Sequence, residues 1–118
     1  MEKNNVIEFI QNAGACIVSK RIINGEAKLK WLLREQPTEK SDNGWRFFSN
    51  LDDSEYINNP DNIIVCDFNT VANIEPAIIG IYLLPIGSDI QLVSENGKIS
   101  FYDNITSEKI DPIYKTEG

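Results

Sequence analysis

The chain contains no histidine among its 118 residues. This absence removes the commonest general base in proteins, and with it the Ser-His-Asp triad, the Cys-His pair and the usual zinc sites. The sequence also lacks a glycine-rich phosphate loop and a dinucleotide-binding fingerprint. Its two cysteines, Cys16 and Cys66, are too far apart in the chain to form a Cys-x-x-Cys site. We therefore expect no catalytic residues, no metal and no cofactor, and we expect that the protein is not an enzyme.

Long apolar runs are missing too. None approaches the roughly 20 residues that a membrane-spanning helix needs. The first residues, Met-Glu-Lys-Asn-Asn, are not a basic start followed by a long apolar stretch, so we expect no signal peptide and a cytoplasmic location. In that compartment Cys16 and Cys66, which both lie in β-type apolar runs, are expected to be small buried side chains without a redox or metal role.

Basic residues are scarce relative to acidic ones, and the formal net charge is −7. Residues 1–34 carry a net charge of +3, whereas residues 35–61 and residues 62–118 each carry −5. An acidic surface repels nucleic acid and favours basic partners. Acidic composition is also common among proteins that need it only for solubility. The charge therefore argues against a nucleic-acid partner and is compatible with a basic protein partner.

Length and composition are those of an ordinary folded domain. The hydrophobic fraction is 42% and the charged fraction is 25%. No repeat, low-complexity tract or linker divides the chain. We expect a single domain over residues 1–118, with a polar, proline-broken end that is loose from about residue 104.

Local patterns predict the elements of the first half. A short helix is expected from Val6 to Ala13, because Asn5 can cap it and Glu8 completes a capping box. Apolar β-type patterns predict strands at residues 15–23 and 28–34, with Leu29, Trp31 and Leu33 on one face of the second. Between these strands lies Asn24-Gly25, which is typical of a type I′ hairpin turn.

The second half combines short helices with further strands. Strands are expected at residues 45–49, 63–68, 90–94 and 98–102, the last two joined by the hairpin signal Asn96-Gly97. Helices are expected at residues 52–58, from residue 69 or 70 to 74, and from Pro76 to about Tyr82. Strands and helices do not alternate regularly. This order predicts an α+β fold with a mainly antiparallel sheet of about five to six strands and short helices packed on it.

The segment from Asn43 to Pro60 combines large aromatic side chains with many carboxylates. Trp45 and Phe47 fall on one face of a predicted strand and are assigned to the core, while Arg46 is expected to pair with a carboxylate of the helix at 52–58. Core elements seldom carry so many acids, and protein interfaces favour aromatic anchors with a charged rim. We predict that a partner contacts six residues: Asp52, Asp53, Glu55 and Tyr56, with Asp42 and Asp61 as rim charges. A cation site at these acids is disfavoured because they lack the alternating oxygen ligands and central glycine of an EF-hand loop.

Several strings of residues closely resemble one family. They are Gly44-Trp-Arg-Phe-Phe-Ser49, Asp52-Asp-Ser-Glu-Tyr56, Asn59-Pro-Asp-Asn62 and Cys66-Asp-Phe-Asn-Thr-Val-Ala-Asn73, with Ala15-Cys-Ile-Val-Ser19 and Leu33-Arg-Glu-Gln-Pro37 upstream. Over roughly residues 14–90 the chain resembles the domain of unknown function 2185 family, also described as the immunity protein 33 group. The resemblance implies a cytosolic immunity protein that neutralises a toxin exchanged between bacteria. It implies no catalytic residues.

The sequence therefore predicts a non-enzymatic binding protein of immunity type, whose partner is a protein such as a basic toxin, and not a nucleic acid or a membrane. One alternative is a small regulatory or scaffold domain that binds another cellular protein. Another is an enzyme or small-ligand binder that uses carboxylates around Asp67, and a deep polar pocket there would favour it.

Overall fold

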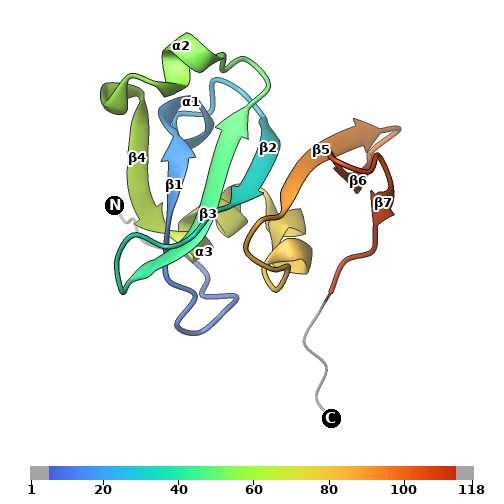
Figure 1. The fold of residues 1–118 in the computed structure, drawn as a ribbon, viewed down its shortest axis with the longest axis horizontal. Helices are drawn as coiled ribbons and strands as arrows, with labels where there is room; N and C mark the ends of the chain where they lie inside the picture. The colour runs from blue at the N-terminus through green and yellow to red at the C-terminus, as the bar shows by residue number, and fades with distance from the viewer. Residues whose placement is uncertain (1–5, 114–118) are drawn as a thin grey trace.

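The computed structural model describes residues 6–113 and places seven strands in one sheet, in the order β4-β1-β3-β2-β5-β6-β7 (Figure 1). The strands are β1 (Ala15–Ser19), β2 (Leu29–Arg34), β3 (Asp42–Ser49), β4 (Ile63–Asp67), β5 (Asp89–Glu95), β6 (Lys98–Asp103) and β7 (Lys109–Ile110). The helices are α1 (Lys20–Ile23), α2 (Ser54–Ile57) and α3 (Phe68–Ile74), and the 3-10 helices are η1 (Pro60–Asn62) and η2 (Pro76–Ile81). The α+β class and the mainly antiparallel sheet are confirmed, with more strands than predicted.

The predicted hairpin at Asn24-Gly25 is wrong. β1 and β2 are not neighbours, because β3 lies between them, parallel to β1 and antiparallel to β2. The chain leaves β1 into α1, and Ser19 caps this helix by accepting a hydrogen bond from Arg21 N at 3.2 Å. A type I′ turn needs positive φ at both central residues. Only Gly25 has it, with φ of 76°, whereas Asn24 has φ of −83° and closes α1.

The second hairpin is confirmed. Asn96 and Gly97 both have positive φ, 53° and 78°, and they join β5 to β6 over a continuous antiparallel register. Two-residue turns of this kind match the right-handed twist of the strands that they connect. Beyond Asp103 the chain adds β7, which pairs with β6.

The prediction that Leu29, Trp31 and Leu33 share one face of β2 is wrong, because the strand contains an irregularity. The register against β3 shifts between Leu29 and Trp31, as in a β-bulge. The side-chain alternation changes phase at such a point. Leu29 and Leu32 are therefore buried together, whereas Trp31 and Leu33 are only partly buried.

The predicted helix over residues 6–13 is wrong, and its proposed cap, Asn5, lies outside the described residues. Residues 6–13 run as bends and a turn, and side-chain amides of α3 satisfy the backbone. Asn69 donates to Ile10 O at 2.9 Å and accepts from Ile10 N at 3.0 Å. Asn73 binds Ile7 O and Ile7 N in the same two-bond manner. These four bonds replace the helical bonds that so short a segment would form weakly on its own.

The remaining helices stay close to prediction. α2 is shorter than expected because Asp53 is its N-cap, accepting from Tyr56 N at 2.9 Å. α3 begins directly after β4, with Asp67 as its N-cap. The segment from Pro76 is a 3-10 helix. Within residues 6–113 no helix is long and apolar enough to cross a membrane.

The core is built on aromatic side chains from β3, α3 and η2. Trp45 and Phe47 are fully buried and confirm their assignment to the core. Their rings stack at a centroid distance of 5.9 Å, and Phe47 continues to Phe68 at 5.9 Å. Phe68 in turn meets Tyr82 edge-on at 4.7 Å. Buried aromatic pairs of this geometry contribute about 0.5–1.5 kcal/mol beyond their burial.

Candidate protein-binding surface

The loop that follows β3 is fixed by Asp52. Its side chain is fully buried, with a relative exposure of 0%. The carboxylate accepts from Ser49 N at 2.6 Å and from Arg21 Nη1 at 3.1 Å. Arg21 Nη1 also donates to Leu51 O at 2.8 Å, so both residues hold the loop against α1. Asp52 is among the residues predicted to contact a partner, but its buried carboxylate cannot touch one directly.

Tyr56 covers the same arginine. The guanidinium carbon of Arg21 lies 3.8 Å from the centroid of the Tyr56 ring, a close cation–π contact. Tyr56 is only partly buried. Arg21 thus joins α1, the loop and α2 into one unit, with its charge offset by Asp52 and its plane covered by the ring.

Three acids remain exposed beside this unit: Asp53, Glu55 and Asp61. Asp53 and Glu55 lie at the start of α2, and Asp61 lies in the first turn of η1. Asn62 Nδ2 donates to Tyr56 O at 3.0 Å and so ties η1 to α2. Within the part of the chain that the structure describes, no cation lies within ion-pair distance of the three carboxylates. We call Asp53, Glu55 and Asp61 the acidic ridge. α2, which contains Glu55 and is capped by Asp53, lies at the end of the sheet where β1 meets α1 (Figure 1).

Asp42 is not an exposed rim charge. Its side chain is 11% exposed and binds both terminal nitrogens of Arg46 at 2.9 Å. Backbone N–H groups of Thr38 and Gly44 donate to the same carboxylate at 2.8 Å. The hydrogen bonds from Arg46 hold the pKa of Asp42 well below its usual range.

The partner predicted for Arg46 is wrong. It binds Asp42 on its own strand and Glu35 Oε1, at 3.0 Å from Nε, and it makes no ion pair with residues 52–58. Arg46 is 4% exposed although it lies on β3 between Trp45 and Phe47. Its side chain therefore covers the sheet face opposite the aromatic core. Phe48 lies opposite Trp31 on β2 and is partly buried.

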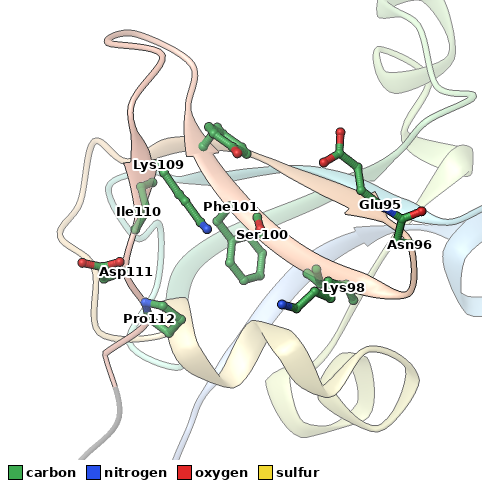
Figure 2. Close-up of a pocket in the computed structure, with 11 residues that line it drawn as sticks. Glu95, Asn96, Lys98, Ser100, Phe101, Lys109, Ile110, Asp111 and Pro112 are labelled. Atoms are coloured by element: carbon green, nitrogen blue, oxygen red, sulfur yellow. The ribbon is translucent and has the colours of Figure 1, made fainter.

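Asp67, the centre of the carboxylate-enzyme alternative, is exposed and caps α3 by accepting from Asn69 N at 2.8 Å. A hollow of about 460 Å³ lies elsewhere, over β6 and β7. Figure 2 shows Phe101 and Ser100 near its middle, with Glu95 and Asp111 at opposite ends. Two carboxylates placed so far apart do not converge on a common point, as acid and base catalysis requires.

Sequence reasoning missed Arg21 and Glu35. Arg21 organises the loop from thirty-one positions before Asp52, and Glu35 reaches Arg46 across two strands. No local motif marks either contact, since both depend on strand pairing. The sequence offers one signal for these contacts, which is charge: Arg21 and Arg46 are cations in a chain that has few cations.

Comparison with known proteins supplies the remaining evidence. No curated protein and no solved structure matches the chain significantly. The family described as Immunity protein Imm33 domain matches residues 16–102, from β1 to β6. The match covers most of the chain and reaches further toward the C-terminus than the resemblance noted in the sequence. The chain therefore belongs to the Imm33 immunity protein family.

Proposed function

We propose that the protein is a cytoplasmic, non-enzymatic immunity protein that neutralises a bacterial toxin by binding it directly. Membership of the Imm33 family is the observation that carries this proposal. The family name implies a protein partner, and the chain offers a surface suited to one. No step of the proposal requires a metal or cofactor.

The acidic ridge is the proposed contact surface. Asp53, Glu55 and Asp61 are exposed and lie on two short helices that are tied together through Asn62. Unpaired surface charges of one sign accelerate association with a partner of opposite sign and set its orientation. A toxin that acts on nucleic acid needs a basic cleft, and the ridge would compete for that cleft. Tyr56, partly exposed beside the ridge, is the proposed aromatic anchor.

Asp52 and Asp42 have a different part in this proposal. Both carboxylates are held inside by arginine and backbone donors. Asp52 positions the loop before α2, and Asp42 supports β3. Replacing Asp52 would thus weaken binding through the shape of the surface and not through its charge.

Capture of partners followed by a growth assay tests the proposal. Tagged wild-type protein, a ridge variant (Asp53→Lys, Glu55→Lys, Asp61→Lys) and a control variant (Glu26→Lys, Glu95→Lys, Glu108→Lys) are incubated with lysate of the native cell. The control changes the same charge at exposed positions outside the ridge. Captured proteins are identified by mass spectrometry, and each is then expressed alone in bacteria.

The expected result is one captured protein that arrests growth when expressed alone. Co-expression of wild-type or control protein should restore growth, whereas the ridge variant should not. A captured protein that is harmless on its own would favour the regulatory or scaffold alternative and contradict the immunity function. Rescue by the ridge variant as strong as that by the control would leave the immunity function standing and remove the ridge as its surface.

A further inference from the structure

The fold brings the two cysteines together. Cys16 on β1 and Cys66 on β4 are direct partners in the antiparallel register of these strands. Opposed side chains of an antiparallel pair point to the same face of the sheet. Both residues are free thiols. The expectation of two small buried side chains is met by Cys16, whereas Cys66 is only partly buried, and the register places the two thiols opposite each other.

The ladder also fixes their spacing. Phe68 N donates to Gly14 O at 2.9 Å, two positions along the same register from the cysteines. Hydrogen-bonded pairs recur at every second position of an antiparallel ladder, so Cys16 and Cys66 form such a pair, with a typical Cα separation of about 5.5 Å. Disulfides span Cα separations of about 4.4–6.8 Å. The Cα separation of this pair therefore lies within the range that a disulfide spans.

The two thiols differ in access and acidity. Cys16 is 1% exposed, whereas Cys66 is partly exposed on β4, which among the described residues is the edge strand of the sheet, paired with β1 (Figure 1). The proximity of the two thiols lowers the pKa of Cys66 and raises that of Cys16, and burial raises the pKa of Cys16 further. Burial of Cys66 and the nearby charge of Asp67 oppose the lowering of its pKa. Cys66 is therefore the more reactive thiol. Cys16 lies opposite it and can attack an oxidised Cys66 sulfur to form a disulfide.

A metal site fits this pair less well. Structural zinc sites use four ligands, commonly cysteine and histidine. The chain has no histidine, and the residues that the structure describes contain no group of three or more histidine, cysteine, aspartate or glutamate side chains able to hold a metal ion. Two adjacent thiols without further ligands are instead the composition of a redox pair.

We propose that Cys16 and Cys66 form a redox-active dithiol that a hydroperoxide oxidises to a disulfide between β1 and β4. The Cys66 thiolate attacks the peroxide oxygen; an S–O bond forms, the O–O bond breaks, and the departing oxygen takes up a proton. Cys16 then attacks the Cys66 sulfenic sulfur. The S–S bond forms, and the hydroxyl leaves with the Cys16 proton as water. The two thiols lose two electrons, and the hydroperoxide gains them.

The disulfide would fix the edge strand that follows the acidic ridge, since η1 leads directly into β4. Cys16 is buried, so a reductant would reach the bond through Cys66, which is partly exposed on the edge strand β4. The pair therefore suits reversible oxidation better than permanent cross-linking. This inference does not depend on the immunity function.

Peptide mapping tests the proposal. The reduced full-length protein is treated with hydrogen peroxide in native buffer, its remaining thiols are alkylated in denaturant, and the digest is analysed by mass spectrometry. We expect the Cys16 and Cys66 peptides to be linked in monomeric protein and released by dithiothreitol. In Cys16→Ser, dimedone should trap a sulfenic acid on Cys66. In Cys66→Ser, oxidation of Cys16 should be about tenfold slower or more, because that thiol is buried and has a raised pKa.

Three results would overturn the proposal: both peptides alkylated and unlinked after native oxidation, linkage between chains only, or linkage that forms only in urea. The wild-type digest decides among them even if a serine variant fails to fold. Circular dichroism of each variant shows whether its dimedone result refers to folded protein.

Discussion

Replacing Asp42 with alanine should destabilise the fold several times more than replacing Glu35, although both carboxylates bind the same arginine. The Asp42 side chain is 11% exposed and the Glu35 side chain is 61% exposed. Solvent screens the Glu35 contact, and exposed ion pairs contribute about 0.2–1 kcal/mol. The prediction is that burial, and not the number of ion pairs, sets the energetic importance of this cluster.

The magnitude for Asp42 follows from its contacts. Alanine would remove both bonds to the Arg46 guanidinium and leave Thr38 N and Gly44 N without their acceptor. Breaking a buried pair from one side costs about 3–5 kcal/mol. Glu35 would still bind Arg46, so we expect the lower end, about 3 kcal/mol, for Asp42→Ala and less than about 1 kcal/mol for Glu35→Ala.

Urea unfolding followed by tryptophan fluorescence measures both values, because Trp45 is fully buried in the folded state. Asp42→Asn serves as the matched control, since it keeps the shape while it removes the charge and replaces one acceptor oxygen with an NH2 group, and it should lie between wild type and alanine. Equal effects of Asp42→Ala and Glu35→Ala, or a larger effect at Glu35, would refute the reasoning from burial.

Three further predictions follow from the same region. Arg46 lowers the pKa of Asp42 in the folded protein. The contribution of Asp42 to the free energy of unfolding is therefore complete above the unfolded pKa of about 3.9 and is lost progressively as the pH falls below that value. The urea midpoint should drop with acid more steeply in wild type than in Asp42→Asn. Trp45→Ala should lower the free energy of unfolding by about 3–5 kcal/mol, since it empties a core site and removes a hydrogen bond to Tyr82 O, and a loss below about 1 kcal/mol in urea titration would contradict that. Gly44→Ala should cost at least about 2 kcal/mol in the same titration, because Gly44 has φ of +90° and a methyl group there would collide with Glu35 O; a neutral effect would argue against the strand pairing.

The sequence predicts what neighbouring residues decide. Asn96-Gly97 joins two adjacent strands, so composition sufficed for that hairpin. Asn24-Gly25 is the same dipeptide with another outcome, because α1 takes up the chain and β3 inserts between the flanking strands. Pairing between distant segments has no local signal. The helix expected at residues 6–13 failed for a related reason, since its backbone is bound by two asparagines of α3 about sixty positions later.

In the candidate surface, too, some features follow from neighbouring residues and others depend on residues far away in the chain. Composition found the acids of residues 52–61, and local rules explain why Asp53 caps α2. Burial of Asp52 depends on Arg21, and burial of Asp42 depends on Arg46, so exposure of these acids could not be read from their own neighbours. Separation along the chain does not give distance in space, so the pairing of Cys16 with Cys66 has no signal in the sequence.

The position of β1 has a consequence for biosynthesis. β1 is the first strand that the structure describes, yet both of its neighbours, β3 and β4, come later in the chain. A ribosome adds roughly 5–20 residues per second, so the apolar segment at residues 15–19 stays without a partner for seconds while the strands that enclose it are made. The hairpin of β5 and β6, by contrast, can close as soon as it emerges. Chaperone binding to the nascent chain should therefore concentrate on its earliest strand, until β3 and β4 have been made.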